Sequence, residues 1–187
     1  MGRVLRYVMR MNVSDEALAE AAAGGDAAAF STLIERVYDR LFALCFRLMG
    51  STAEAEDLCQ DICVALPGKL GSYRGQAKVT TWLYRVTVNA ATDRRRRQAS
   101  YGRATEGWGD WEVDRQKTVS EAAANLDWLH AALAQLSPTL RDTLALVLDD
   151  LTQAEVAEIL GTSEGTIAWR VSEAKVQLKK IKAREDV

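Results

Sequence analysis

Apolar residues recur at intervals of three and four along residues 26–50, from Phe30 to Leu48. This spacing places them on one face of an α-helix, and Gly50 is suited to end that helix. No stretch of strand length alternates apolar and polar residues, and only two prolines occur among the 187 residues. The pattern predicts an all-α protein.

Two further helices are expected in this first block. Ser51 and Glu54 have the spacing of a capping box, and the helix they open places Cys59 and Leu66 on its apolar face. Pro67 and Gly68 are expected to end it. Residues 68–77 hold three glycines and read as a loop. The next helix is expected over residues 79–97, with a buried stripe of Val79, Trp82, Leu83, Val86 and Ala90.

A polar stretch over residues 98–120 shows no helical period, and we expect it to link two small helical domains. The second block is expected to hold helices near residues 121–136, 139–149, 152–160 and 164–182. The boundaries that follow are an N-terminal extension at 1–13, a domain at 14–98, a linker at 99–120 and a domain at 121–187.

The last two helices have the pattern of a helix-turn-helix. Thr152 and Glu155 form a second capping box, Gly161 ends the first helix, and Ser163 is placed to cap the next. Ala154, Ala157 and Leu160 are expected to pack the first helix, and Ile167, Val171, Ala174 and Leu178 the second. The pattern favours DNA binding through the second helix, and the alternative is an αα-hairpin that packs against protein.

The net charge of −2 conceals a strong segregation of acidic and basic residues along the chain. Residues 14–66 carry ten acidic and three basic residues, whereas residues 67–103 carry nine basic residues and one acidic residue. Arg94–Arg97 end a helix that also carries aromatic and amide side chains, a combination that suits unpaired nucleic acid. Two simpler interpretations stay open: the arginines are a solvated helix end, and Trp82 is core.

Several functional classes are disfavoured. No apolar run reaches membrane-spanning length and the start of the chain lacks a signal peptide, so we expect an intracellular, cytoplasmic protein with no membrane insertion. A single histidine and the absence of a phosphate-binding loop or paired-carboxylate signature argue against an enzyme. Cys45, Cys59 and Cys63 are interpreted as core residues in preference to zinc or redox ligands, and no metal or cofactor is expected.

Three strings, in this order, resemble extracytoplasmic-function sigma factors of RNA polymerase. STAEAEDLCQDICVALP is similar to the helix that grips the polymerase clamp, and SYRGQAKVTTWLYRVTVNAATDRRRR to the promoter-melting, −10-reading helix. Residues 133–178 resemble the −35-reading domain. The resemblance implies sigma domain two at 14–98 and sigma domain four at 121–187, with core RNA polymerase, promoter DNA and an anti-sigma factor as partners.

The resemblance also assigns residues. The polymerase-binding positions are Asp57, Gln60 and Asp61. Those facing the −10 element are Tyr73, Gly75, Gln76, Lys78, Trp82, Tyr84, Arg85, Asn89, Asp93, Arg94, Arg95, Arg96 and Arg97. Those facing the −35 element are Ser163, Thr166, Ala168, Trp169, Arg170, Glu173 and Lys175.

Two departures from the family pattern stand out. The recognition helix is poor in bases, with Ala168 and Glu173 at positions that often carry Arg or Lys, and Trp169 suits either a thymine methyl or a protein partner. The N-terminal Arg3, Arg6 and Arg10 have no counterpart. The acidic linker residues 110–114 are suited to run through the polymerase channel as a nucleic-acid mimic.

Three functions are therefore weighed. The leading hypothesis is an alternative sigma factor that binds core polymerase and directs promoter recognition. The second is a sigma-like decoy that binds an anti-sigma factor without reading DNA, which the base-poor recognition helix favours and the arginine run opposes. The third is a stand-alone repressor, which the elaborate first block argues against.

Overall fold

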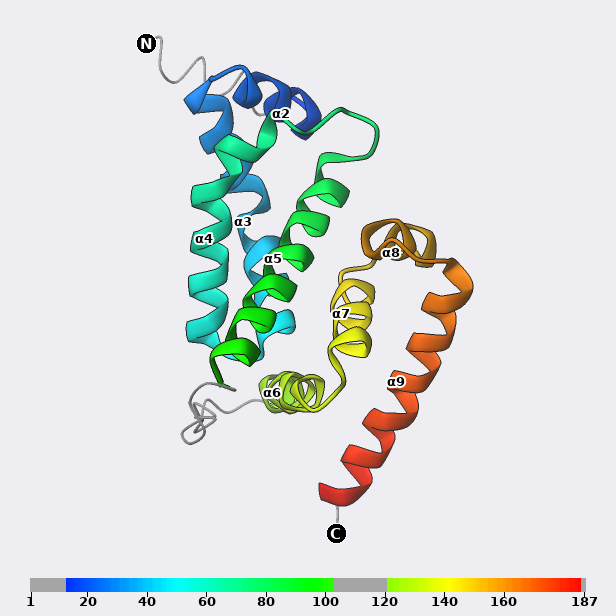
Figure 1. Cartoon of the computed structure of the whole chain (residues 1–187). Helices are drawn as coiled ribbons and strands as arrows, with labels where there is room; N and C mark the ends of the chain where they lie inside the picture. Colours follow the sequence, from blue (N-terminus) through cyan, green and yellow to red (C-terminus); the bar gives the residue numbers. More distant parts are fainter. Residues whose placement is uncertain (1–12, 103–120, 186–187) are drawn as a thin grey trace.

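The computed structural model describes the backbone of residues 13–102 and 121–185 and the side chains of residues 13–100 and 128–184. All regular structure in these ranges is helical, which confirms the expected all-α class (Figure 1). The expected contributions of Arg3, Arg6 and Arg10 and of the acidic residues 110–114 lie outside the described residues.

The first block contains four helices, α2 (Asp15–Ala23), α3 (Ala27–Met49), α4 (Thr52–Leu70) and α5 (Val79–Gly102). Asp26 caps α3 by accepting from the backbone N–H groups of Ala28 and Ala29, and Gly50 ends it with φ at 83°. Ser51 caps α4 by accepting from the N–H of Glu54. Local hydrogen bonds therefore set the helix ends where the sequence places them.

Three expectations about the first block are wrong. Pro67 lies inside α4, which continues to Leu70, because the buried side chains of Leu66 and Leu70 hold the last turn on the core. Residues 98–102 belong to α5 and not to the linker. The fully buried positions of α5 include Leu83, Tyr84 and Ala91, whereas Trp82, Val86 and Ala90 are only half-buried.

The second block contains α6 (Glu121–Ala134), α7 (Pro138–Val147), α8 (Gln153–Leu160) and α9 (Glu164–Glu185). Thr152 and Glu155 form the expected capping box and Gly161 ends α8 with φ at 62°. Ser163 accepts from the N–H of Thr166 at 3.2 Å, as expected of a cap on α9. Ala154 is exposed, contrary to expectation, and α8 packs through Val156, Ala157 and Ile159.

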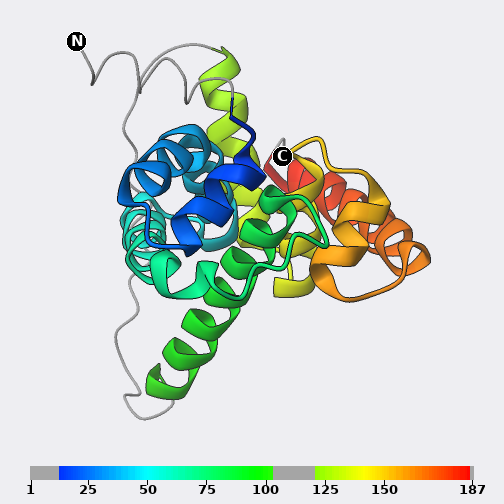
Figure 2. The same ribbon diagram turned by 90° about the horizontal axis from the view of Figure 1, so that it is seen from above.

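The two blocks pack against each other. Helix α7 contacts α3 and α8 contacts α5, and residues of both blocks share one hydrophobic core, to which Leu146, Val156 and Ile159 contribute from the second block. Figure 1 shows α5 between the α3–α4 pair and the α7–α8 pair. In Figure 2 the C-terminal end of α5 extends beyond the other helices, and Arg96 and Arg97 on it are exposed.

Candidate functional site

The loop before α5 forms a pocket lined by aromatic and basic side chains. Gly75 adopts the left-handed conformation with φ at 67°, which lets the chain turn sharply between α4 and α5. The Tyr73 ring lies 5.7 Å from the Trp82 ring, and the Tyr73 hydroxyl donates to the carbonyl of Ala77 at 2.8 Å. The cavity measures about 280 Å³, and its walls come from Ser72, Tyr73, Arg74, Gln76, Ala77, Thr81, Trp82, Arg85 and Glu158.

A second cavity of about 290 Å³ lies between α4 and α5. Asn89, Asp93 and Arg97 line it from α5, with Asp61 and Lys69 from α4. Asn89 and Asp93 are exposed, and Asp93 is paired with Arg96 at 3.2 Å. The exposed face of α5 therefore offers amide, carboxylate and guanidinium groups along one continuous edge.

The expected polymerase-binding residues lie on the exposed face of α4. Asp57 and Asp61 are one helical turn apart, and the Arg94 guanidinium lies 2.9 Å and 3.4 Å from their carboxylates. Gln60 and Val64 are exposed on the same helix. Arg94 of α5 therefore links α5 to α4 through these two ion pairs. The sequence did not indicate this pairing, because the resemblance assigned Arg94 to DNA phosphate.

Four of the thirteen residues expected at the −10 element contact the second block. The Lys78 ammonium lies 3.2 Å from Glu155, Arg85 donates to the carbonyl of Glu158 at 2.8 Å, and Arg95 lies 2.7 Å from Asp142. The Tyr84 hydroxyl donates to Asp149, and burial followed by this hydrogen bond raises the pKa of Tyr84.

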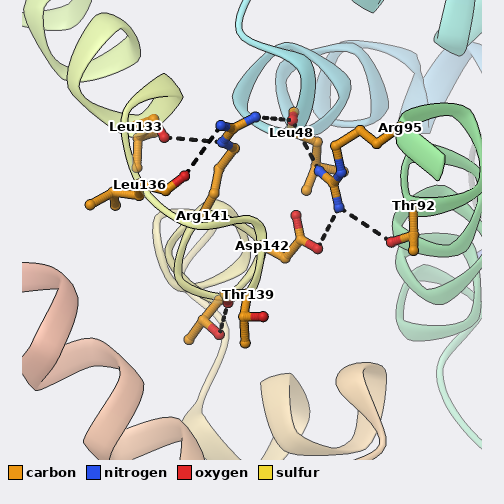
Figure 3. A network of polar contacts seen from close by, with 9 residues as sticks. Leu48, Thr92, Arg95, Leu133, Leu136, Thr139, Arg141 and Asp142 are labelled. Atoms are coloured by element: carbon orange, nitrogen blue, oxygen red, sulfur yellow. Dashed lines mark hydrogen bonds and ion pairs between the residues drawn. The ribbon is translucent and has the colours of Figure 1, made fainter. Parts of the chain in front are cut away.

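The sequence did not indicate Asp142 and Asp149 as residues of this contact region. Nor did it indicate Arg47, which pairs with Asp149. The Arg47 guanidinium lies 2.5 Å from Asp149 and donates to the carbonyl of Ala145 at 3.0 Å. Burial raises the pKa of Asp142, against the lowering effect of Arg95. Figure 3 shows Arg95 bridging Thr92, Leu48 and Asp142. The only sequence signal that could have found these contacts was Arg47, a basic residue between the apolar residues Phe46 and Leu48.

The N-terminal half of the recognition helix α9, residues 164–175, presents few basic groups. Trp169 is 63% exposed and Val176 44% exposed, while Glu173 accepts from Gln177 at 2.9 Å. Ala168 and Lys175 are exposed, and Thr166 and Arg170 are partly buried. Ser163 is exposed at the helix start. This face combines an indole ring, small residues and two cations.

The three cysteines lie together between α3 and α4. Cys45 and Cys59 are buried, as expected, and Cys63 is partly buried. The hydrogen bond that the Cys59 thiol donates to Cys45, together with burial, raises the pKa of Cys59 to about 11. Among the described residues no cluster of three His, Cys, Asp or Glu side chains is arranged to hold a metal ion. The thiols therefore behave as core groups.

This pKa gives a direct test. We expect native Cys59 to react slowly with iodoacetamide at about pH 8, because only the thiolate is nucleophilic, and its reaction rate to keep rising beyond about pH 10. Unfolding in urea should expose all three thiols to fast alkylation. Mass spectrometry of labelled peptides measures each site, and fast labelling of native Cys59 at about pH 8 would contradict the structural role.

Two family models match the chain. Sigma-70 region 2 matches residues 33–101 and Sigma-70, region 4 matches residues 126–178. The first therefore spans most of α3 to α5 and the second most of α6 to α9, so both cavities lie within or beside the region 2 match.

Curated relatives match along most of the chain. The ECF RNA polymerase sigma factor SigM of Mycobacterium tuberculosis is 33% identical over 170 residues, covering 90% of this chain and 84% of the relative. The ECF RNA polymerase sigma factor SigW of Bacillus subtilis is 28% identical over 170 residues, covering 83% of this chain and 90% of the relative.

Solved structures share the fold at lower identity. CnrH in complex with the cytosolic domain of CnrY matches with a TM-score of 0.66 at 23% identity, covering 91% of this chain and 97% of that one. RpoE from Bartonella quintana, in complex with the anti-sigma factor NepR, matches with a TM-score of 0.69 at 23% identity, covering 82% and 96%. With both sigma-70 regions in order and a relative above 30% identity over most of its length, this chain belongs to the family of ECF RNA polymerase sigma factors.

Proposed function

We propose that this chain is an alternative sigma factor that binds core RNA polymerase through α4, captures the separated −10 strand along α5, and docks near −35 through α9. In this role it performs no chemistry of its own and acts in the cytoplasm, where polymerase and chromosome meet. Strand separation is driven by binding energy, since an unstacked base gains contacts inside the protein that it lacks in solvent.

The observation that carries the proposal is the pair of cavities on α5. The pocket beside the loop before α5 is lined by the aromatic residues Tyr73 and Trp82 and by the basic residues Arg74 and Arg85. Aromatic rings accept unstacked bases and cations follow phosphates. The second cavity adds Asn89 and Asp93, whose amide and carboxylate suit the edges of bases.

The exposed face of α4 is suited to contact core polymerase, and the exposed face of α9 is suited to contact the −35 element. Asp57 and Asp61 offer two exposed carboxylates to a basic partner helix. Such charge pairing sets the register and the rate of association. On α9 the exposed Trp169 suits contact with a thymine methyl, and Arg170 and Lys175 suit phosphate. Because Arg170 and Lys175 are the only cations in the N-terminal half of α9, we infer that −35 contact adds less affinity than −10 contact.

Family membership also supports an anti-sigma partner. RpoE of Bartonella quintana was solved in complex with the anti-sigma factor NepR, and CnrH in complex with the cytosolic domain of CnrY. We propose that this chain is held by a regulator of that class until its signal arrives, because a free factor competes for polymerase.

The experiment that tests the function is transcription itself. Purified chain, core polymerase and fragments of the host genome are mixed, and the 5′ ends of the transcripts are sequenced. Starts that share an upstream motif and depend on the chain support the sigma function. A decoy predicts no such starts but still binds an anti-sigma factor, which separates the two hypotheses.

Asn89 provides a residue-level test of −10 recognition. We expect Asn89→Ala to weaken the preference for the −10 motif by roughly tenfold, because an amide that bonds a base edge carries about 1–3 kcal/mol of discrimination. The helix should keep its stability, since alanine is the better helix former. Ser100→Ala, on the exposed end of α5, is the matched control, and unchanged start-site choice in Asn89→Ala would remove Asn89 from the −10 reader.

A further inference from the structure

Helix α2 lies beside the loop that forms the aromatic pocket, the cavity lined by Tyr73 and Trp82. It contacts both α4 and α5, and Figure 1 and Figure 2 show it next to the chain that leads from the end of α4 into α5. Glu16, in the first turn of α2, accepts a hydrogen bond from the backbone N–H of Val79 at 3.4 Å. Val79 is the first residue of α5, so a side chain of α2 holds the start of the helix to which strand binding is assigned.

This contact satisfies a group that the helix itself leaves without a partner. The first four N–H groups of an α-helix have no acceptor within the helix, and the helix N-terminus carries a partial positive charge. Val79 is 0% exposed, so its N–H would meet no solvent that could replace Glu16. A buried donor left unpaired is costly, and we expect the first turn of α5 to shift when the acceptor is removed.

Glu16 also faces the other end of the loop. Burial raises the pKa of the Tyr73 hydroxyl, and the negative charges of Glu16 and Glu20 raise this pKa further. The same hydroxyl donates to the carbonyl of Ala77 at 2.8 Å and so closes the loop on itself. The carboxylate of Glu16 is therefore near both Tyr73, in the wall of the aromatic pocket, and Val79, at the start of α5.

The start of α2 is anchored on α3 and on the core. The Arg36 guanidinium lies 2.8 Å from the carboxylate of Asp15 and donates to the carbonyl of Val13 at 2.7 Å. Leu18 and Ala19 are buried, at 2% and 0% exposed. Glu16 lies between these anchors, so its position is set by the packing of α2 on α3 and not by the loop that it contacts.

We propose that Glu16 is a positioning residue for −10 recognition, which holds the first turn of α5 and the loop before it in the shape that receives a separated base. The inference rests on the proposed function of α5. The residues that line the two cavities do not include Glu16, so it acts through the loop and not through contact with the strand. Without it the loop samples other shapes, and base capture falls with the fraction of molecules whose pocket is correctly formed.

Variants of the full chain separate the hydrogen bond from the charge. Glu16→Ala removes both, and Glu16→Asp keeps the charge but draws the carboxylate back by one methylene, out of reach of the Val79 N–H. Glu16→Gln removes the charge and keeps an oxygen that accepts from Val79. Glu20→Ala is the matched control, because it removes an exposed α2 carboxylate near Tyr73 without touching the bond between Glu16 and Val79. Alanine is a good helix former, so α2 should persist, and circular dichroism checks that each variant is folded.

The measurement is transcription by core RNA polymerase from a promoter library whose −10 element is randomised, followed by sequencing of the transcribed templates. We expect Glu16→Ala and Glu16→Asp to weaken the base preference about fivefold at one position of the motif, the one read in the aromatic pocket. The position affected by Asn89→Ala should keep its preference within about twofold, as should retention on immobilised core polymerase. Glu16→Gln should restore most of the lost preference, and Glu20→Ala should match the wild type.

A role in folding alone predicts a different outcome. It would lower transcription from every template alike, without changing the relative preference between bases, and that result would overturn the proposal. So would an unchanged preference in Glu16→Ala, or an equal loss in Glu20→Ala, which would assign the effect to the charge of α2 in place of the hydrogen bond.

The wild type separates this inference from the proposed function. If the wild-type chain initiates transcription nowhere, the proposed function itself is wrong, and the role of Glu16 falls with it. If the wild type shows a base preference that Glu16→Ala retains in full, only the role of Glu16 is rejected.

Discussion

Reversing the charges of Asp57 and Asp61 to lysine is expected to abolish co-purification of this chain with core RNA polymerase. Both carboxylates are exposed on α4, one turn apart, and both point toward the single cation Arg94. A basic partner helix would meet two like charges in the variant, and such repulsion costs several kcal/mol, or at least about 100-fold in affinity. The measurement is retention of the variant on immobilised core polymerase.

The chain offers a matched control for this change. Glu35 and Asp39 are also exposed, also four residues apart, and lie on the neighbouring helix α3. Glu35→Lys/Asp39→Lys changes the net charge equally and should leave polymerase binding within about twofold. If the Asp57→Lys/Asp61→Lys variant stays folded and is retained as well as this control, the polymerase grip lies on another face.

Replacing Arg141 by methionine is expected to destabilise the chain by about 3 kcal/mol, which corresponds to a fall in melting temperature of roughly 6–12 °C. The Arg141 guanidinium is buried and donates to the carbonyl oxygens of Leu133, Ala134, Leu136 and Leu48. Figure 3 shows the bonds to Leu133, Leu136 and Leu48. Leu133 and Ala134 belong to the C-terminal end of α6, where helical carbonyls lack partners within the helix, and Leu136 lies just beyond that end. Methionine keeps the volume and leaves the carbonyls unsatisfied.

Thermal denaturation followed by circular dichroism measures this loss. Arg184→Met removes an exposed arginine near the end of α9 and should change stability by less than about 0.5 kcal/mol. Arg141→Lys should recover part of the loss, because an ammonium still donates to some of the carbonyls. An Arg141→Met variant as stable as Arg184→Met would show that the carbonyls find water or other donors.

The family and the order of its parts were within reach of the sequence, because the strings around α4, α5 and α9 carry the resemblance. The resemblance assigned Asn89 and Asp93 to the −10 element, and both are exposed on α5. Tyr84 and Arg95 could not be placed in this way. Their neighbours Asp149 and Asp142 lie 65 and 47 residues further along the chain, and no local pattern encodes such a pairing.

The sequence by itself determined the helices and most of their ends. Asp26, Gly50, Thr152 and Gly161 act on backbone groups within a few residues, so their effect is visible in the order of the side chains. The extension of α4 through Pro67 and the docking of α7 on α3 and of α8 on α5 were decided only by tertiary structure. In both, burial of distant apolar side chains and pairing of distant charges outweighed local preference, since such contacts exist only once the helices have packed.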